Sequence, residues 1–112
     1  MKIEFDNPKH EKLVNDYDML CSRYNKKKGV DSASAILMAL DVLNAANTLA
    51  DVPPSYRPHP LKGAYKGYFA VDVDKINRII FKPNHEGDAD YRIDNYKTIK
   101  NISIIEIFKD YH

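Results

Sequence analysis

The alternation of apolar and polar residues predicts a strand at the N-terminus, followed by a helix. Residues 2–5 alternate polar and apolar, which is typical of a half-buried strand. Asn7 and Pro8 come next, an N-cap residue and a proline suited to the first helical position. We expect a first helix that ends at a run of lysines followed by Gly29. Its apolar face consists of Leu13, Val14, Tyr17, Leu20, Cys21 and Tyr24.

A second helix is predicted between two further signals. Asp31 or Ser32 can cap its start, and Pro53 and Pro54 end it. We expect the two helices to form an antiparallel hairpin across one face of a sheet. The apolar stripe of the second helix consists of Ala33, Ile36, Leu37, Leu40, Leu43, Ala46 and Ala50.

The rest of the sequence favours strands, because it is rich in aromatic and β-branched residues. Residues 68–73 and 78–81 form two such runs, and the polar residues 74–77 between them predict a hairpin turn. Residues 102–108 predict the last strand. The predicted fold class is therefore α+β, with an N-terminal strand and a two-helix hairpin packed on one face of a mostly antiparallel sheet.

A polar stretch at residues 83–101 separates the last two predicted strands. Residues 94–99 within it are compatible with a helical turn. His85, Glu86, Asp88 and Asp90 are potential metal ligands, but their spacing fits neither an EF-hand loop nor a helical zinc pair. We therefore expect a solvated loop there and no metal site.

Length and cysteine content narrow the class of protein. At 112 residues the chain is long enough for one hydrophobic core, so we expect a single domain over residues 1–112. Its one cysteine, Cys21, excludes an internal disulfide and fits a reducing cytoplasm. No signal-peptide layout occurs, and no apolar run approaches the ~20 residues that span a bilayer. We expect a cytoplasmic protein without a membrane anchor.

The charge is nearly balanced overall but not locally. The formal charge of +1, from 17 Lys+Arg and 16 Asp+Glu, argues against a general polyanion binder. In residues 56–82, six cations minus two aspartates leave +4. This stretch is either a cationic surface that attracts phosphate or an ordinary lysine-bearing strand edge. The six cations are Arg57, Lys62, Lys66, Lys75, Arg78 and Lys82.

Two segments far apart in the sequence carry residues suited to acid–base chemistry. His59 and Lys62 lie three residues apart among prolines, and Tyr111 and His112 follow the last predicted strand. Imidazole both accepts and releases protons near neutral pH, because its unperturbed pKa is about 6.5. Each residue also has a plain structural interpretation: His59 as a surface turn, Lys62 as a solvated side chain, and the tail as a frayed end.

The segment His-Pro-Leu-Lys-Gly at 59–63, the run Arg-Ile-Ile-Phe at 78–81 and the final Tyr-His occur in a characteristic order. In these motifs the chain resembles the HigB branch of the RelE/ParE superfamily of bacterial toxins, over residues 36–112. The resemblance implies a microbial-RNase-like fold and an endoribonuclease without metal or cofactor. The chain departs from the pattern in its near-neutral charge, its polar insertion at 83–101 and its longer helical region.

The resemblance also implies roles for five catalytic candidates. His59 and His112 would act as acid and base, and Lys62 and Arg78 would stabilise the negative charge on phosphorus. Tyr111 would stack on a base or donate a hydrogen bond to phosphate.

Further roles concern the surroundings of these candidates. Arg57, Lys66 and Lys82 are expected to bind RNA. Asp110 would orient a neighbour, and the α-carboxylate next to the imidazole of His112 is expected to favour its imidazolium form.

By the same resemblance, the chain would be the toxin of a toxin–antitoxin pair. It would cleave mRNA in the ribosomal decoding site, leave a 2′,3′-cyclic phosphate, and pair with a helix-turn-helix antitoxin of the HigA type. Two alternatives stay open. The first is a non-catalytic protein, either a ParE-like binder that poisons a topoisomerase or a degenerate toxin. The second is a small α+β interaction domain without enzymatic role. The His/Lys/His set favours the nuclease, because ParE-like chains are expected to lack it.

Overall fold

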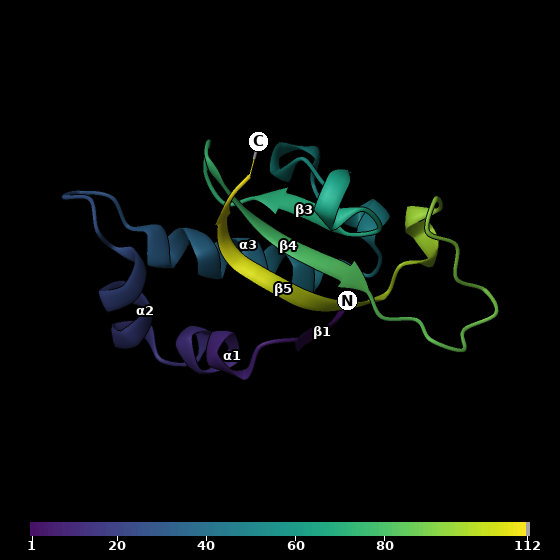
Figure 1. Ribbon diagram of the computed structural model, residues 1–112, viewed down its shortest axis with the longest axis horizontal. Coiled ribbons are helices and arrows are strands. Elements are labelled where there is room, and N and C mark those ends of the chain that lie inside the picture. The colour runs from purple at the N-terminus through teal and green to yellow at the C-terminus, as the bar shows by residue number, and fades with distance from the viewer. Residues whose placement is uncertain (112) are drawn as a thin grey trace.

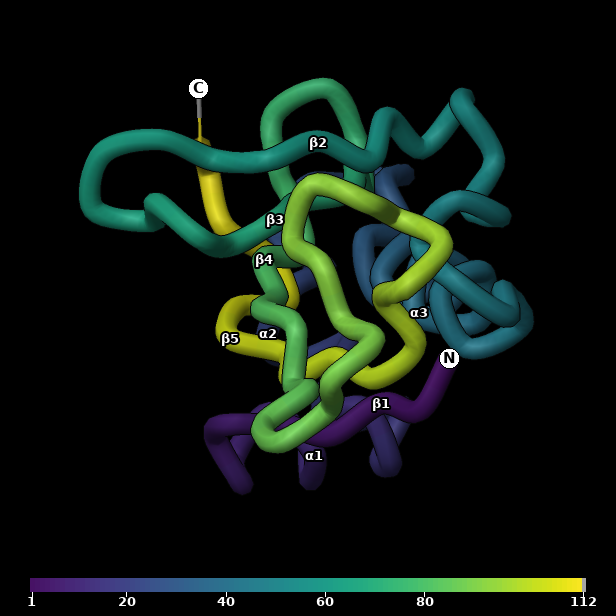
Figure 2. The backbone as a smooth tube through the Cα atoms, turned by 90° about the vertical axis from the view of Figure 1, so that its right-hand side faces the viewer, coloured from purple at the N-terminus to yellow at the C-terminus, as the bar shows by residue number. Residues whose placement is uncertain are grey.

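A five-stranded sheet with the order β1-β5-β4-β3-β2 forms the centre of the protein, as a computed structural model describes it for residues 1–111. β1 runs parallel to β5 and the other neighbours are antiparallel. β1 and β2 therefore form opposite edges of the sheet (Figure 2). The strands are β1 (Lys2–Phe5), β2 (His59–Pro60), β3 (Phe69–Asp72), β4 (Asn77–Pro83) and β5 (Asn101–Asp110).

The predicted first helix is in fact two helices, α1 (Pro8–Val14) and α2 (Tyr17–Tyr24). The expected cap at Asn7 is confirmed, since its side chain accepts a hydrogen bond from the Lys9 N–H. The prediction of one continuous helix is wrong because two further capping residues interrupt it. Asn15 ends α1, and the Asp16 side chain accepts from Met19 N–H at the start of α2.

The second predicted helix is shorter than expected. α3 covers Ser32–Ala45 and is capped by Asp31, as predicted, but it ends well before the two prolines. Ala46 is extended, and a separate 3₁₀ turn, η1 (Leu49–Asp51), follows. The α-amino group of Met1 donates hydrogen bonds to the carbonyls of Leu43, Asn44 and Ala46. These bonds satisfy carbonyls that the helix end leaves without an internal partner.

The predicted β3–β4 hairpin and last strand are confirmed, and β4 pairs with β5 despite the insertion between them. β2 was not predicted. It is a two-residue edge strand whose His59 lies opposite Ala70 and whose Pro60 lies opposite Phe69. A proline is tolerated there because the outer side of an edge strand needs no N–H donor.

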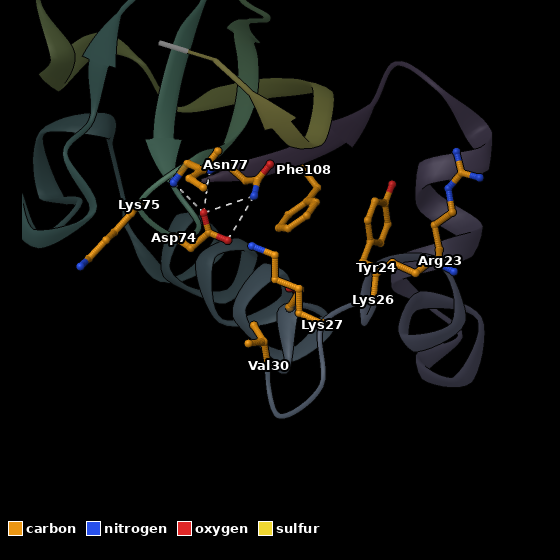
Figure 3. A pocket seen from close by; sticks show the side chains of 11 residues that line it. Arg23, Tyr24, Lys26, Lys27, Val30, Asp74, Lys75, Asn77 and Phe108 are labelled. Carbon is orange, nitrogen blue, oxygen red and sulfur yellow. Dashed lines mark hydrogen bonds between the residues drawn. The ribbon is translucent and has the colours of Figure 1, made fainter.

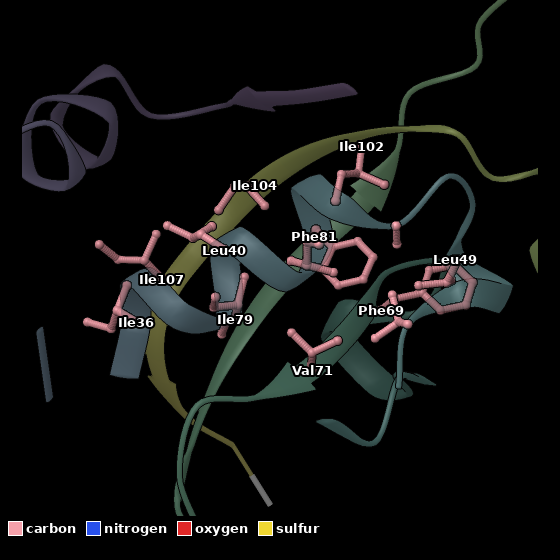
Figure 4. Packing of buried hydrophobic residues seen from close by; sticks show 14 of the residues in the cluster. Ile36, Leu40, Leu49, Phe69, Val71, Ile79, Phe81, Ile102, Ile104 and Ile107 are labelled. Atoms are coloured by element: carbon pink, nitrogen blue, oxygen red, sulfur yellow. The ribbon is translucent and has the colours of Figure 1, made fainter. Parts of the chain in front are cut away.

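The helices cover one face of the sheet, where the main core lies (Figure 1). Side chains of α3 such as Ile36 and Leu40 pack against sheet residues such as Ile79, Phe81 and Ile104 (Figure 4). Each fully buried side chain of this size contributes roughly 1.5–3 kcal/mol relative to exposure. The opposite face carries a smaller cluster around Leu61, Ala70 and Ile80. Among the catalytic candidates, His59, Arg78 and Tyr111 belong to this second face.

The insertion lies at the opposite end of the sheet from the C-terminus (Figure 1). It contains a 3₁₀ turn, η4 (Tyr96–Thr98), where a helical turn was compatible with the sequence. The expectation of a solvated loop is wrong for His85, whose side chain is 1% exposed. Its Nε2 accepts hydrogen bonds from the N–H groups of Lys100 and Asn101, and its ring stacks on Tyr91. The insertion is therefore anchored to the start of β5.

In the described part of the chain, no helix has both the length and the apolar character needed to cross a bilayer.

Candidate functional site

The chain tail and the His-Pro-Leu-Lys-Gly segment meet on the second face of the sheet. The hydroxyl of Tyr111 donates a hydrogen bond to the main-chain carbonyl of Lys62, at 3.2 Å. The ring of Tyr111 packs edge-on against Tyr65, with centroids 5.7 Å apart. Beneath them, Leu61 packs on Ala70 and Ile80. Two segments 49 residues apart in sequence are thus held together by a hydrogen bond and a small apolar cluster.

His59 is positioned with one ring nitrogen already bound. Its Nδ1 lies 2.6 Å from the carbonyl oxygen of Arg57. Because a carbonyl only accepts, Nδ1 carries the proton, and Nε2 is left to exchange a proton with a substrate. Arg57 ends the 3₁₀ turn η2 (Pro54–Tyr56) in the left-handed conformation, with φ of 49°. This turn directs the Arg57 carbonyl towards the imidazole.

The half-buried His59 shares its face of the sheet with a carboxylate that sequence reasoning missed. His59, Ala70, Ile80 and Glu106 lie opposite one another on four neighbouring strands. Directly opposite residues point to the same face, so His59 and Glu106 flank the same apolar row, about 14 Å apart at the backbone. Glu106 is half-buried and has no charged partner within residues 1–111. A lone carboxylate inside the apolar run of residues 104–108 was the available signal.

Arg78 lies on this face, but most of its guanidinium group is bound to the β3–β4 hairpin. It is 6% exposed, and its Nε lies 2.9 Å from Oδ1 of Asp72 directly opposite. Nη1 donates to the carbonyls of Asp74 and Asn77, and Nη2 donates to that of Lys75. Three of its five N–H groups therefore donate hydrogen bonds to backbone carbonyls, and the Nε side of the guanidinium forms the ion pair with Asp72. Arg78 therefore braces the hairpin, and most of its guanidinium is engaged within the protein.

The turn that Arg78 braces is also stabilised by Asp74. Partial burial raises the pKa of Asp74, but hydrogen bonds from the N–H groups of Asn77 and Ile76 outweigh it and lower the pKa below its usual value. Asp74 therefore stays charged and keeps the turn closed. The hairpin end next to Arg78 is thus a rigid element.

The catalytic candidate Lys62 and the three predicted RNA-binding cations, Arg57, Lys66 and Lys82, divide into two groups. Lys62 and Lys66 are exposed and flank the 3₁₀ turn η3 (Gly63–Tyr65) that follows β2. The side chain of Arg57 is 63% exposed and lies 3.7 Å from Asp72. Lys82 instead reaches away to Asp6, at 3.9 Å, beyond the end of β1. Arg57 thus contacts His59, Lys62 and Lys66 lie at the turn that follows β2, and Lys82 lies apart from them.

His112 lies outside the described residues, so its predicted role stays a prediction. Its neighbour Tyr111 is the last described residue, and its hydroxyl is bound to the Lys62 carbonyl. Within residues 1–111, no three His, Cys, Asp or Glu side chains converge as a metal site would require.

The fold is α+β, with helices on one face of a mostly antiparallel sheet. Among solved structures, a chain of the YoeB-YefM complex from Staphylococcus aureus is similar, with a TM-score of 0.53 and 18% sequence identity. The match covers 99% of this chain and 98% of that chain. At this identity the likeness establishes the fold, which is the one the sequence predicted. No protein-family model and no curated protein matches the chain.

Proposed function

We propose that the chain is the toxin of a toxin–antitoxin pair and a metal-independent endoribonuclease that cleaves mRNA on the ribosome. The observation that carries this proposal is the contact of Tyr111 with Lys62, which places the tail beside the segment that holds His59. The RelE-like fold supports the same class. His59, Arg78 and Tyr111 belong to one face of one sheet, which supports a shared reaction centre.

The proposed reaction uses the 2′-hydroxyl of the substrate as nucleophile. A base, His59 through Nε2, takes the 2′-hydroxyl proton as the 2′-oxygen bonds to phosphorus. The bond from phosphorus to the 5′-oxygen breaks, and His112 protonates that oxygen. The products are a 2′,3′-cyclic phosphate and a 5′-hydroxyl. Lys62, with a contribution from Arg78, neutralises the charge on the phosphorane oxygens.

Tyr111 receives a more specific role than the sequence allowed. Its hydroxyl proton is engaged with the Lys62 carbonyl, so it acts as a positioning residue that holds the tail in place. Its half-buried ring is still available to a base. The ribosome would supply the orientation of the scissile bond, and a helix-turn-helix antitoxin of the HigA type would be the partner in the cytoplasm.

Induction of the chain alone in a bacterial host tests this proposal. We expect growth arrest and new mRNA ends that carry 5′-hydroxyl groups, mapped by end-specific ligation. The double variant His59→Ala with Lys62→Ala should abolish both, because it removes a proton-transfer group and a cation. Growth arrest that survives in this variant without new mRNA ends would instead favour a ParE-like binding mechanism.

A further inference from the structure

A cavity of about 410 Å³ lies on the helical side of the sheet, at the end that carries the tail (Figure 3). It opens between the connection from α2 to α3 and the β3–β4 turn. Tyr24 and Phe108 form part of its wall, in edge-on contact with centroids 5.2 Å apart. Its volume falls within the roughly 300–1,000 Å³ typical of small-ligand sites.

Positive charge is concentrated around this cavity. Four cations line it against one carboxylate, Asp74, which leaves +3 in a chain whose total is +1. Asp74 is saturated by hydrogen bonds from Ile76 and Asn77. The four cations are Arg23, Lys26, Lys27 and Lys75.

Most of these cations have no partner that neutralises them. Lys26 donates to the carbonyl of Ser22, but Arg23, Lys27 and Lys75 form no ion pair within residues 1–111. Figure 3 shows Lys27 extending from its loop towards Asp74 and Phe108. Unpaired cations around an aromatic wall are the combination that binds single-stranded nucleic acid, where charge holds the backbone and rings contact bases.

The cavity and the proposed catalytic face share the β3–β4 turn. Lys75 and Asn77 line it, and both belong to the turn whose carbonyls Arg78 binds from the other side. Asn77 lies opposite Asp110, one residue before Tyr111. A polyanion that crosses the catalytic face therefore reaches the cavity by passing around one hairpin turn.

We propose that this cavity binds a nucleotide of the RNA strand that flanks the scissile bond. Lys27 and Lys75 hold its phosphate, and Tyr24 and Phe108 contact its base. The negative charge of an acidic protein segment would also match the cations of the cavity. A single compact hollow nevertheless suits one nucleotide better than a helix, which needs an extended groove. This inference rests on the proposed nuclease function for the identity of the strand.

Binding of an uncleavable probe tests the inference separately from catalysis. The full chain is titrated with a fluorescent, fully 2′-O-methylated single-stranded RNA, which lacks the attacking 2′-hydroxyl, and anisotropy is measured over a range of salt. The test variant is Lys27→Ala with Lys75→Ala. The matched control is Lys2→Ala with Lys97→Ala, which removes the same charge from exposed residues at the other end of the molecule.

We expect the test variant to bind RNA roughly tenfold more weakly than the control, with a salt slope reduced by about 0.7 for each phosphate that the protein no longer neutralises. A probe with one 5-iodouridine should photo-cross-link to Tyr24 or Phe108. Equal affinity of the two variants, or no binding by the wild type, would overturn the inference. So would variants that lose only the binding of a polyglutamate peptide. Absence of mRNA cleavage by the wild type, with RNA binding that the test variant weakens, would count against the nuclease proposal alone.

Discussion

Tyr111 donates its hydroxyl hydrogen bond to the main-chain carbonyl of Lys62, at 3.2 Å, and so ties the end of β5 to the segment after β2. This hydrogen bond does not involve the Lys62 side chain, because the acceptor is the main-chain carbonyl. The Lys62 ammonium stays exposed and free to meet a phosphate. One hydrogen bond therefore joins the two segments and leaves the Lys62 ammonium group unused.

Replacement of Tyr111 by phenylalanine tests this positioning role. We expect the free energy of unfolding to fall by only about 1 kcal/mol, because one hydrogen bond is removed and the ring still packs on Tyr65. The rate of mRNA cleavage should fall about tenfold, since small displacements of reacting groups are costly. Tyr68→Phe is the control, a tyrosine of the same cluster whose hydroxyl forms no hydrogen bond within residues 1–111. Equal cleavage by both variants would refute the role.

The pairing of Arg78 with Asp72 should stabilise the β3–β4 hairpin. Arg78→Ala is expected to lower the free energy of unfolding by about 2–3 kcal/mol, because it removes the ion pair with Asp72 and leaves three carbonyls without their donor. A double-mutant cycle with Asp72→Asn, followed by urea denaturation, measures the coupling. Additive losses in the two single variants would show that the brace does not exist.

His85 should anchor the insertion through its ring nitrogens. In His85→Ala, the N–H groups of Lys100 and Asn101 lose their acceptor, and we expect faster amide hydrogen exchange there and about 2–4 kcal/mol less stability. Exposed Glu86 next to it gives the control Glu86→Ala, which should change neither quantity. Unchanged exchange at both amides in the His85 variant would contradict this account.

Stability should fall on acidification because several aspartates have lowered pKa values in the folded chain. Hydrogen bonds from Ser34 lower the pKa of Asp31, and hydrogen bonds from Asp90 and His85 lower that of Asp88. Their contribution is complete above the usual value of 3.8 and is lost as pH falls through the folded pKa. Urea denaturation from about pH 6 to about pH 3 should show this decline, and Asp31→Asn should flatten it. A flat profile for the wild type would be inconsistent with these shifts.

Capping residues and β-rich runs predicted much of the fold. Asn7 and Asp31 marked two helix starts correctly, and the polar turn at 74–77 marked the hairpin. The break at Asn15 and Asp16 was readable from the same chemistry, but the apolar stripe that continues across it concealed it.

Other features depend on tertiary interactions that no local pattern encodes. The strand at His59 is two residues long and exists only because β3 pairs with it. The engagement of Arg78 by backbone carbonyls and the place of Glu106 opposite Ile80 both follow from tertiary register. The candidate residues could thus be chosen from the sequence. Which of their N–H groups are already bound, and which residues share a face of the sheet, could not be predicted from it.

The most direct test of the central claim is a double-mutant cycle on mRNA cleavage by purified protein on programmed ribosomes, with His59→Ala and His112→Ala. If the two imidazoles serve one reaction, each single variant should lose at least about 10²-fold in rate, and the double variant should be little worse than the poorer single one. Full activity in either single variant, or losses that multiply in the double variant, would contradict a shared site built from these two segments.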